Sequence, residues 1–147
     1  MSETFSFERS HDVEVEAPPE AVFDLVTNPN SWPKWLAASN HIESADRPLA
    51  KGETFRELWH TRTGEAELKW VVQESDRGRL WIGETGTPFI GPIIVRYDFE
   101  ATDKGSRFTR TLINPARPKP ITDDMIQRID EEAAIGLGNV KRIVEAG

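Results

Sequence analysis

Residues 15–36 of this chain constrain its fold more than any other stretch. Pro18 and Pro19 follow an alternating, strand-like segment, and the first turn of a helix tolerates proline because amide hydrogens there lack intrahelical partners. Apolar residues then recur at three- and four-residue spacing, which is typical of an amphipathic helix. Pro29 ends that helix, because the residue before a proline disfavours the helical conformation. We therefore expect a strand, a helix, and a second short helix that carries Trp32 and Trp35.

The segment before this stretch alternates with a period of two. The even-numbered residues from 6 to 16 are all polar. The opposite parity carries Phe5, Phe7, Arg9, His11, Val13 and Val15. Because successive side chains of a strand face opposite sides of a sheet, this pattern predicts a sheet with one wet face and one covered face. Arg9 and His11 fall on the covered face.

Further strands are expected at residues 41–45, 53–60, 65–74, 80–85, 93–99 and 107–114. Gly-containing turn signals separate several of them, at residues 76–78 and 103–105. The facing of strand 80–85 stays open, because both parities carry apolar residues. Residues 114–120 contain three prolines and are expected to form a rigid connector.

The chain closes with an amphipathic pattern over residues 121–145, which predicts one long helix. Thr122 is its expected N-cap. Gly136 and Gly138 lie inside it, where each costs roughly 1 kcal/mol relative to alanine. These glycines either allow close packing or a bend, or leave volume for a ligand under the helix.

Residues 22–35 and the closing LGNVKRIVE of residues 137–145 resemble the SRPBCC superfamily, also called START-like, of polyketide cyclases and lipid-transfer proteins. The resemblance covers essentially the whole chain, as a single domain of residues 1–147. It implies the α+β helix-grip fold of the birch pollen allergen. In that fold a curved seven-stranded antiparallel sheet wraps around a long C-terminal helix, and two short helices lie between strands 1 and 2. It also implies a cavity between the sheet and the C-terminal helix.

The composition argues against several classes of partner. A net charge of −7 disfavours nucleic acid and anionic membrane surfaces, which require clustered Lys and Arg. No apolar run approaches the ~20 residues that span a bilayer, and the polar N-terminus does not resemble a signal peptide. We expect a cytoplasmic monomer or homodimer without membrane insertion.

Metal and cofactor chemistry are also not indicated. The three histidines, His11, His41 and His60, lie on separate expected strands and have no ligand spacing. The chain lacks cysteine as well as the GxSxG and GxGxxG motifs. We therefore expect no metal and no cofactor, and either side-chain chemistry or binding without chemistry.

Strand parity places three ionisable side chains, His11, Glu57 and Arg110, on the covered face. An unpaired buried charge is costly, so each must be paired, hydrated or protonated. Glu57 and Arg110 either form an ion pair that only shapes the fold, or act with His11 as polar anchors of an apolar pocket. The aromatic walls of such a pocket would be Phe55, Trp59, Trp70 and Tyr97.

Three functions are open at this point. The first is binding of a small hydrophobic or aromatic ligand, such as a lipid or polyketide. The second is a cofactor-independent polyketide aromatase/cyclase or dehydratase, in which Arg110, Tyr97 or His11 polarises a carbonyl or moves a proton. The third is a co-chaperone-like interaction module, which requires an exposed apolar patch.

Overall fold

The structure, a computed structural model, describes residues 4–36, 39–61, 64–87 and 90–147, and only the backbone of residues 40, 59–61 and 64. Its elements, in chain order, are β1 (Phe5–Val15), α1 (Pro19–Val26), the 3-10 turn η1 (Pro29–Ser31), α2 (Trp32–Trp35), β2 (Ser39–Glu43), β3 (Thr54–Thr61), β4 (Gly64–Asp76), β5 (Leu80–Thr85), β6 (Ile93–Thr102), β7 (Gly105–Arg117) and α3 (Asp123–Ala146).

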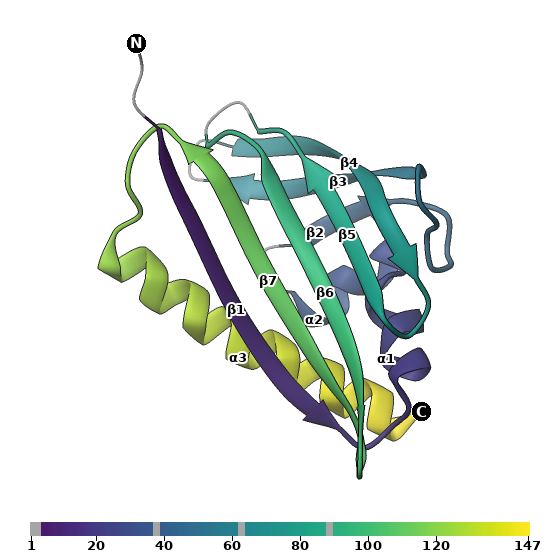
Figure 1. Cartoon of the computed structure of the whole chain (residues 1–147). Helices are drawn as coiled ribbons and strands as arrows, with labels where there is room; N and C mark the ends of the chain where they lie inside the picture. Colours follow the sequence, from purple (N-terminus) through teal and green to yellow (C-terminus); the bar gives the residue numbers. More distant parts are fainter. Residues whose placement is uncertain (1–3, 37–38, 62–63, 88–89) are drawn as a thin grey trace.

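All seven strands form one antiparallel sheet in the order β1-β7-β6-β5-β4-β3-β2. The first strand therefore pairs with the last, and β1 and β2 are the two edges. Figure 1 shows α3 running along β1, with α1 and α2 on the same side of the sheet. Helix α3 contacts β1, α1 and α2. This is the helix-grip arrangement that the sequence predicts.

Aromatic rings fix α2 on the inner face of the sheet. Trp32 meets Phe55, Trp70 and Trp81 edge-on, with ring centroids 5.2, 5.5 and 6.1 Å apart. Its indole Nε1 also donates a hydrogen bond to the carbonyl of Val26 at 2.9 Å, which ties α2 to α1. Trp32 therefore packs the short second helix against the first helix and against β3, β4 and β5 inside the sheet.

Strand β5, whose facing the sequence left open, turns Trp81, Gly83 and Thr85 inward. A Cβ atom on Gly83 would lie 2.8 Å from a ring carbon of Trp81. The indole of Trp81 therefore occupies the space that a side chain at position 83 would need.

Several strand boundaries differ from the prediction, and two of the differences are informative. Strand β2 spans residues 39–43 rather than 41–45. Strand β7 continues through Pro115 to Arg117, whereas the sequence predicts a connector from Asn114. The β1–β7 register shifts between Phe5 and Phe7, opposite this proline. A bulge tolerates proline because the residue there need not donate to the ladder.

Helix α3 begins as predicted, with the Oγ1 of Thr122 accepting a hydrogen bond from the amide of Met125 at 3.2 Å. A Cβ atom on Gly136 would lie 2.9 Å from the carbonyl oxygen of Trp35, whereas one on Gly138 would meet nothing within 4 Å. Gly136 therefore allows close packing of α3 on α2. Gly138 has no such role.

Substitution of these two glycines by alanine should change the free energy of unfolding in opposite directions. Gly138→Ala should raise the free energy of unfolding by up to about 1 kcal/mol, because alanine favours a helix over glycine by that amount. Gly136→Ala should lower it, because the backbone at Trp35 must move away. Urea unfolding of both variants measures the difference. Equal stabilisation by both substitutions would mean that α3 does not pack closely on α2.

Candidate functional site

An interior cavity of about 60 Å³ lies between α2 and the inner face of the sheet. Its lining comes from α2 and the residue after it, and from β2, β3, β4, β6 and β7. The lining residues are Trp32, Leu36, Ser39, Glu57, Trp70, Ile93, Val95, Arg110 and Leu112. None of these described residues belongs to α3. The cavity around the predicted polar residues is therefore covered by α2, not by the C-terminal helix as we expected.

The cavity is small in this structure. An engineered cavity of about 150 Å³ in another protein binds benzene, and pockets for drug-sized ligands measure roughly 300–1,000 Å³. The present space holds a few water molecules. Leu36, Arg110 and Leu112 are the half-buried members of its lining, so the cavity lies nearest to solvent on their side.

Glu57 and Arg110 both line this cavity, as strand parity predicts. Glu57 is 2% exposed, and its Oε1 accepts a hydrogen bond from the indole Nε1 of Trp70 at 3.0 Å. The two side chains therefore face the same cavity. That they form an ion pair which only shapes the fold stays a prediction.

Three buried donors gather beside the cavity. The Nε of Arg110, the hydroxyl of Tyr97 and the Oγ of Ser39 have no hydrogen-bond partner among the described residues. Tyr97 lies directly opposite Arg110 in the β6–β7 ladder. Burial raises the pKa of Tyr97 to about 12, although the positive charge of Arg110 acts in the other direction. Tyr97 is therefore protonated at neutral pH.

The other predicted aromatic residues lie beside the cavity or cannot be placed. Phe55 stacks on Trp70, with ring centroids 5.9 Å apart, and supports that wall from behind. Trp59 belongs to β3, but its side chain lies outside the described part of the chain. Sequence reasoning missed the other lining residues; for Ile93 and Val95, their inward parity was the available signal.

His11 lies opposite Arg110 in the β1–β7 register, but it does not line the interior cavity. Its Nε2 lies 2.7 Å from the Oδ1 of Asp130 on α3. Arg9 donates to both oxygens of the same carboxylate, at 2.9 and 2.6 Å. We call Arg9, His11 and Asp130 the β1–α3 clasp. His11 therefore lines the surface hollow around β1 and not the interior cavity, and its role in ligand binding stays a prediction.

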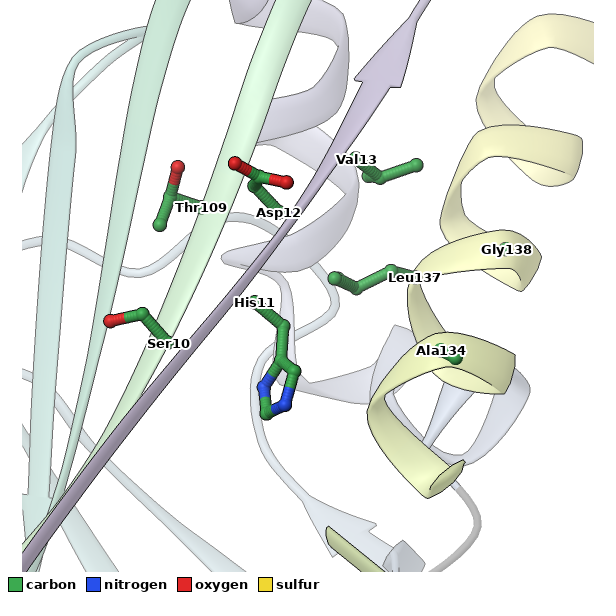
Figure 2. Close-up of a pocket in the computed structure, with 8 residues that line it drawn as sticks. All are labelled: Ser10, His11, Asp12, Val13, Thr109, Ala134, Leu137 and Gly138. Carbon is green, nitrogen blue, oxygen red and sulfur yellow. The ribbon is translucent and has the colours of Figure 1, made fainter. Parts of the chain in front are cut away.

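A larger surface hollow of about 550 Å³ surrounds part of β1. Figure 2 shows its residues on both sides of that strand: Ser10, Asp12 and Thr109 on one side, and His11, Val13, Ala134, Leu137 and Gly138 on the side of α3. This hollow is more open to solvent than the interior cavity.

The β1–α3 clasp predicts acid-sensitive docking of α3. Hydrogen bonds from Arg9 and then from His11 hold the pKa of Asp130 well below its usual range. A carboxyl with a lowered folded-state pKa stabilises the fold above its unfolded pKa of about 3.9, and this stabilisation is lost as the pH falls through the folded value. Asp130→Asn should therefore lower the melting temperature at pH 7, and the gap to the wild type should shrink below about pH 4.

Glu132→Gln, at an exposed position of the same helix, serves as the control and should change the melting temperature little at either pH. A constant gap between the wild type and Asp130→Asn across the acid range would show that the carboxylate charge does not hold α3.

The described residues also bear on the presence of a metal site and of a membrane-spanning helix. Among the described residues, no three His, Asp or Glu side chains gather as a metal site requires. No helix in the same part of the chain is both long and apolar enough to cross a membrane.

A seven-stranded antiparallel sheet, two short helices after its first strand and a long last helix define a helix-grip protein. The chain belongs to the family described as polyketide cyclase/dehydrase and lipid transport, which matches it over residues 4–145. The SRPBCC resemblance in the sequence is thereby confirmed.

Relatives and solved structures agree with this placement. An uncharacterized protein of Mycobacterium tuberculosis is 24% identical over 158 residues, covering 99% of this chain and 89% of the relative. The crystal structure of Ara h 8.0201 is similar with a TM-score of 0.73 at 13% identity, over 97% of this chain and 100% of that one. The Zhui aromatase/cyclase from Streptomyces sp. R1128 has a TM-score of 0.73 at 13% identity, over 96% and 94%. At these identities the two structures support the fold alone.

Proposed function

We propose that this protein binds a compact apolar or aromatic molecule in the cavity between α2 and the sheet. The observation that carries the proposal is the make-up of the lining, in which apolar side chains surround three polar ones, Ser39, Glu57 and Arg110. Small-molecule sites have this character, since apolar walls supply affinity and a few polar groups fix orientation. The family description, which includes lipid transport, agrees with such a role.

Binding requires the cavity to widen. Leu36 and Leu112 are flexible apolar side chains on its half-buried side, so their movement admits a ligand without breaking the sheet. The aromatic wall of Trp32 and Trp70 is 2% exposed at each residue and is fixed by ring packing. We therefore place the entrance on the leucine side.

Isothermal titration calorimetry with a panel of small aromatic and lipid-like probes tests the proposal. Leu112→Trp should fill the cavity and abolish binding, at a stability cost of about 1–3 kcal/mol for overpacking. Ile113→Trp, at the next position of β7 and on its opposite face, should leave binding unchanged. Circular dichroism confirms that both variants fold. Loss of binding in neither variant, or no binding of any probe to the wild type, would refute the proposal.

A second candidate function is acid–base catalysis on the bound molecule, without a cofactor. Glu57 and Arg110 face the same cavity, so a carboxylate and a cationic donor can act on one ligand. Tyr97, with its raised pKa, would donate a proton or a hydrogen bond rather than act as a base. Glu57→Gln should then abolish turnover but retain binding, whereas a carrier shows no turnover in the wild type.

The interaction-module hypothesis receives less support. Among the described residues, Met125 at 39% and Ile135 at 64% are the exposed large hydrophobic side chains, and both are on α3. Two side chains do not form the contiguous apolar patch that a docking surface requires.

A further inference from the structure

We infer that the ligand carries a carbonyl-type oxygen, either a neutral carbonyl or a carboxylate, which accepts hydrogen bonds from Arg110 and Ser39. This inference rests on the binding function proposed above, and it specifies the chemical class of the ligand.

Unpartnered polar atoms are concentrated around the cavity. Buried polar groups in proteins are nearly always hydrogen-bonded, so each exception needs a reason. In the described part of the chain, the buried side-chain atoms without a partner belong to Ser39, Trp81, Tyr97, Thr102 and Arg110. Ser39 and Arg110 line the cavity itself. These two groups therefore face one space, which indicates a shared missing partner.

The chemistry of these groups defines that partner. The guanidinium of Arg110 can only donate hydrogen bonds, and the hydroxyl of Ser39 can donate one. The missing partner is therefore an acceptor. A purely apolar ligand would exclude water and leave buried donors unpaired, at a cost of about 1–3 kcal/mol each.

A carbonyl-type oxygen fits the donors and the space. The planar guanidinium of arginine suits sp² oxygen acceptors, and a single oxygen has two lone pairs for two donors. The present volume of about 60 Å³ accommodates water at this position. A ligand oxygen that displaced a water from this space would offer the donors an equivalent acceptor, so the exchange would lose little.

Three probes of nearly equal shape separate the possibilities. Acetophenone carries a neutral carbonyl, benzoate carries a carboxylate, and α-methylstyrene has a CH₂ group where acetophenone has its oxygen. We expect acetophenone or benzoate to bind the wild-type protein at least about tenfold more tightly than α-methylstyrene, from the loss of one charge-assisted hydrogen bond. The tighter of the two oxygenated probes tells a neutral carbonyl from a carboxylate.

Arg110→Met should remove this preference and bring the three affinities within about twofold, because its apolar side chain no longer penalises a CH₂ group. Ser39→Ala should reduce the preference several-fold and provides a second readout if Arg110→Met folds poorly. Arg107→Met, at an exposed arginine of the same strand that pairs with Glu14, should keep the wild-type preference.

Two results would overturn the inference in different ways. Equal affinity of the wild type for all three probes would refute the acceptor oxygen and leave the binding function intact. Binding of none of the probes, with none from the wider panel, would refute the binding function itself.

Discussion

Trp35→Ala should lower the free energy of unfolding by about 3–5 kcal/mol, the range for tryptophan truncation in a core. Trp35 is 2% exposed and packs on Tyr97 and Phe108, with ring centroids 6.2 and 6.4 Å apart. Its indole Nε1 donates to the Oγ of Ser31 at 3.1 Å. Alanine would remove both ring contacts and leave a void between α2 and the sheet. Urea unfolding followed by circular dichroism measures the loss.

Two variants control this result. Lys34→Ala, at an exposed position of the same helix, should change stability by less than about 0.5 kcal/mol. Trp35→Phe should cost less than Trp35→Ala and should retain probe binding, because Trp35 is not a cavity-lining residue. Unchanged stability of Trp35→Ala together with lost binding would mean that Trp35 is a wall of the ligand site and not a structural residue.

Trp70→Ala should also lower the free energy of unfolding by ~3–5 kcal/mol. Trp70→Phe separates the contribution of ring packing from that of the hydrogen bond to Glu57. Phenylalanine keeps a ring that can stack on Phe55 but lacks the N–H that bonds Glu57 at 3.0 Å. We expect Trp70→Phe to cost about 1–3 kcal/mol, because the buried carboxylate then loses a donor.

A double-mutant cycle with Glu57→Gln checks the cause. The coupling between positions 57 and 70 should be at least about 0.5 kcal/mol, as is usual for residues in direct contact. Strict additivity would show that the cost of Trp70→Phe comes from ring size alone, and that the hydrogen bond contributes little to stability.

The sequence alone predicted those structural features that depend only on residues close together in the chain. A period of two along a strand predicted that Glu57, Trp70, Tyr97 and Arg110 face the interior, because side-chain alternation depends only on the strand itself. The N-cap of α3 at Thr122 was predictable for the same reason, since a cap depends on adjacent residues.

Features that depend on distant partners could not be predicted in this way. Parity assigned His11 to the inner side, but it could not show that Asp130 of α3 lies 2.7 Å away. It also could not show that α2 rather than α3 covers Glu57 and Arg110. In β5 the alternation itself was ambiguous, and only the packing of Trp81 beside Gly83 resolves it.

The pairing of the first strand with the last has a consequence for folding. Paired residues of β1 and β7, such as His11 and Arg110, are about a hundred positions apart along the chain, whereas successive strands from β2 to β7 pair with their immediate neighbours. Closing so long a loop carries an entropic cost before any contact repays it, and non-local pairing slows folding. The antiparallel meander of β2 to β7 can therefore assemble strand by strand during synthesis, whereas β1 cannot pair until β7 has been synthesised. We expect docking of β1 onto β7 to complete this edge of the sheet, next to α3, late in folding.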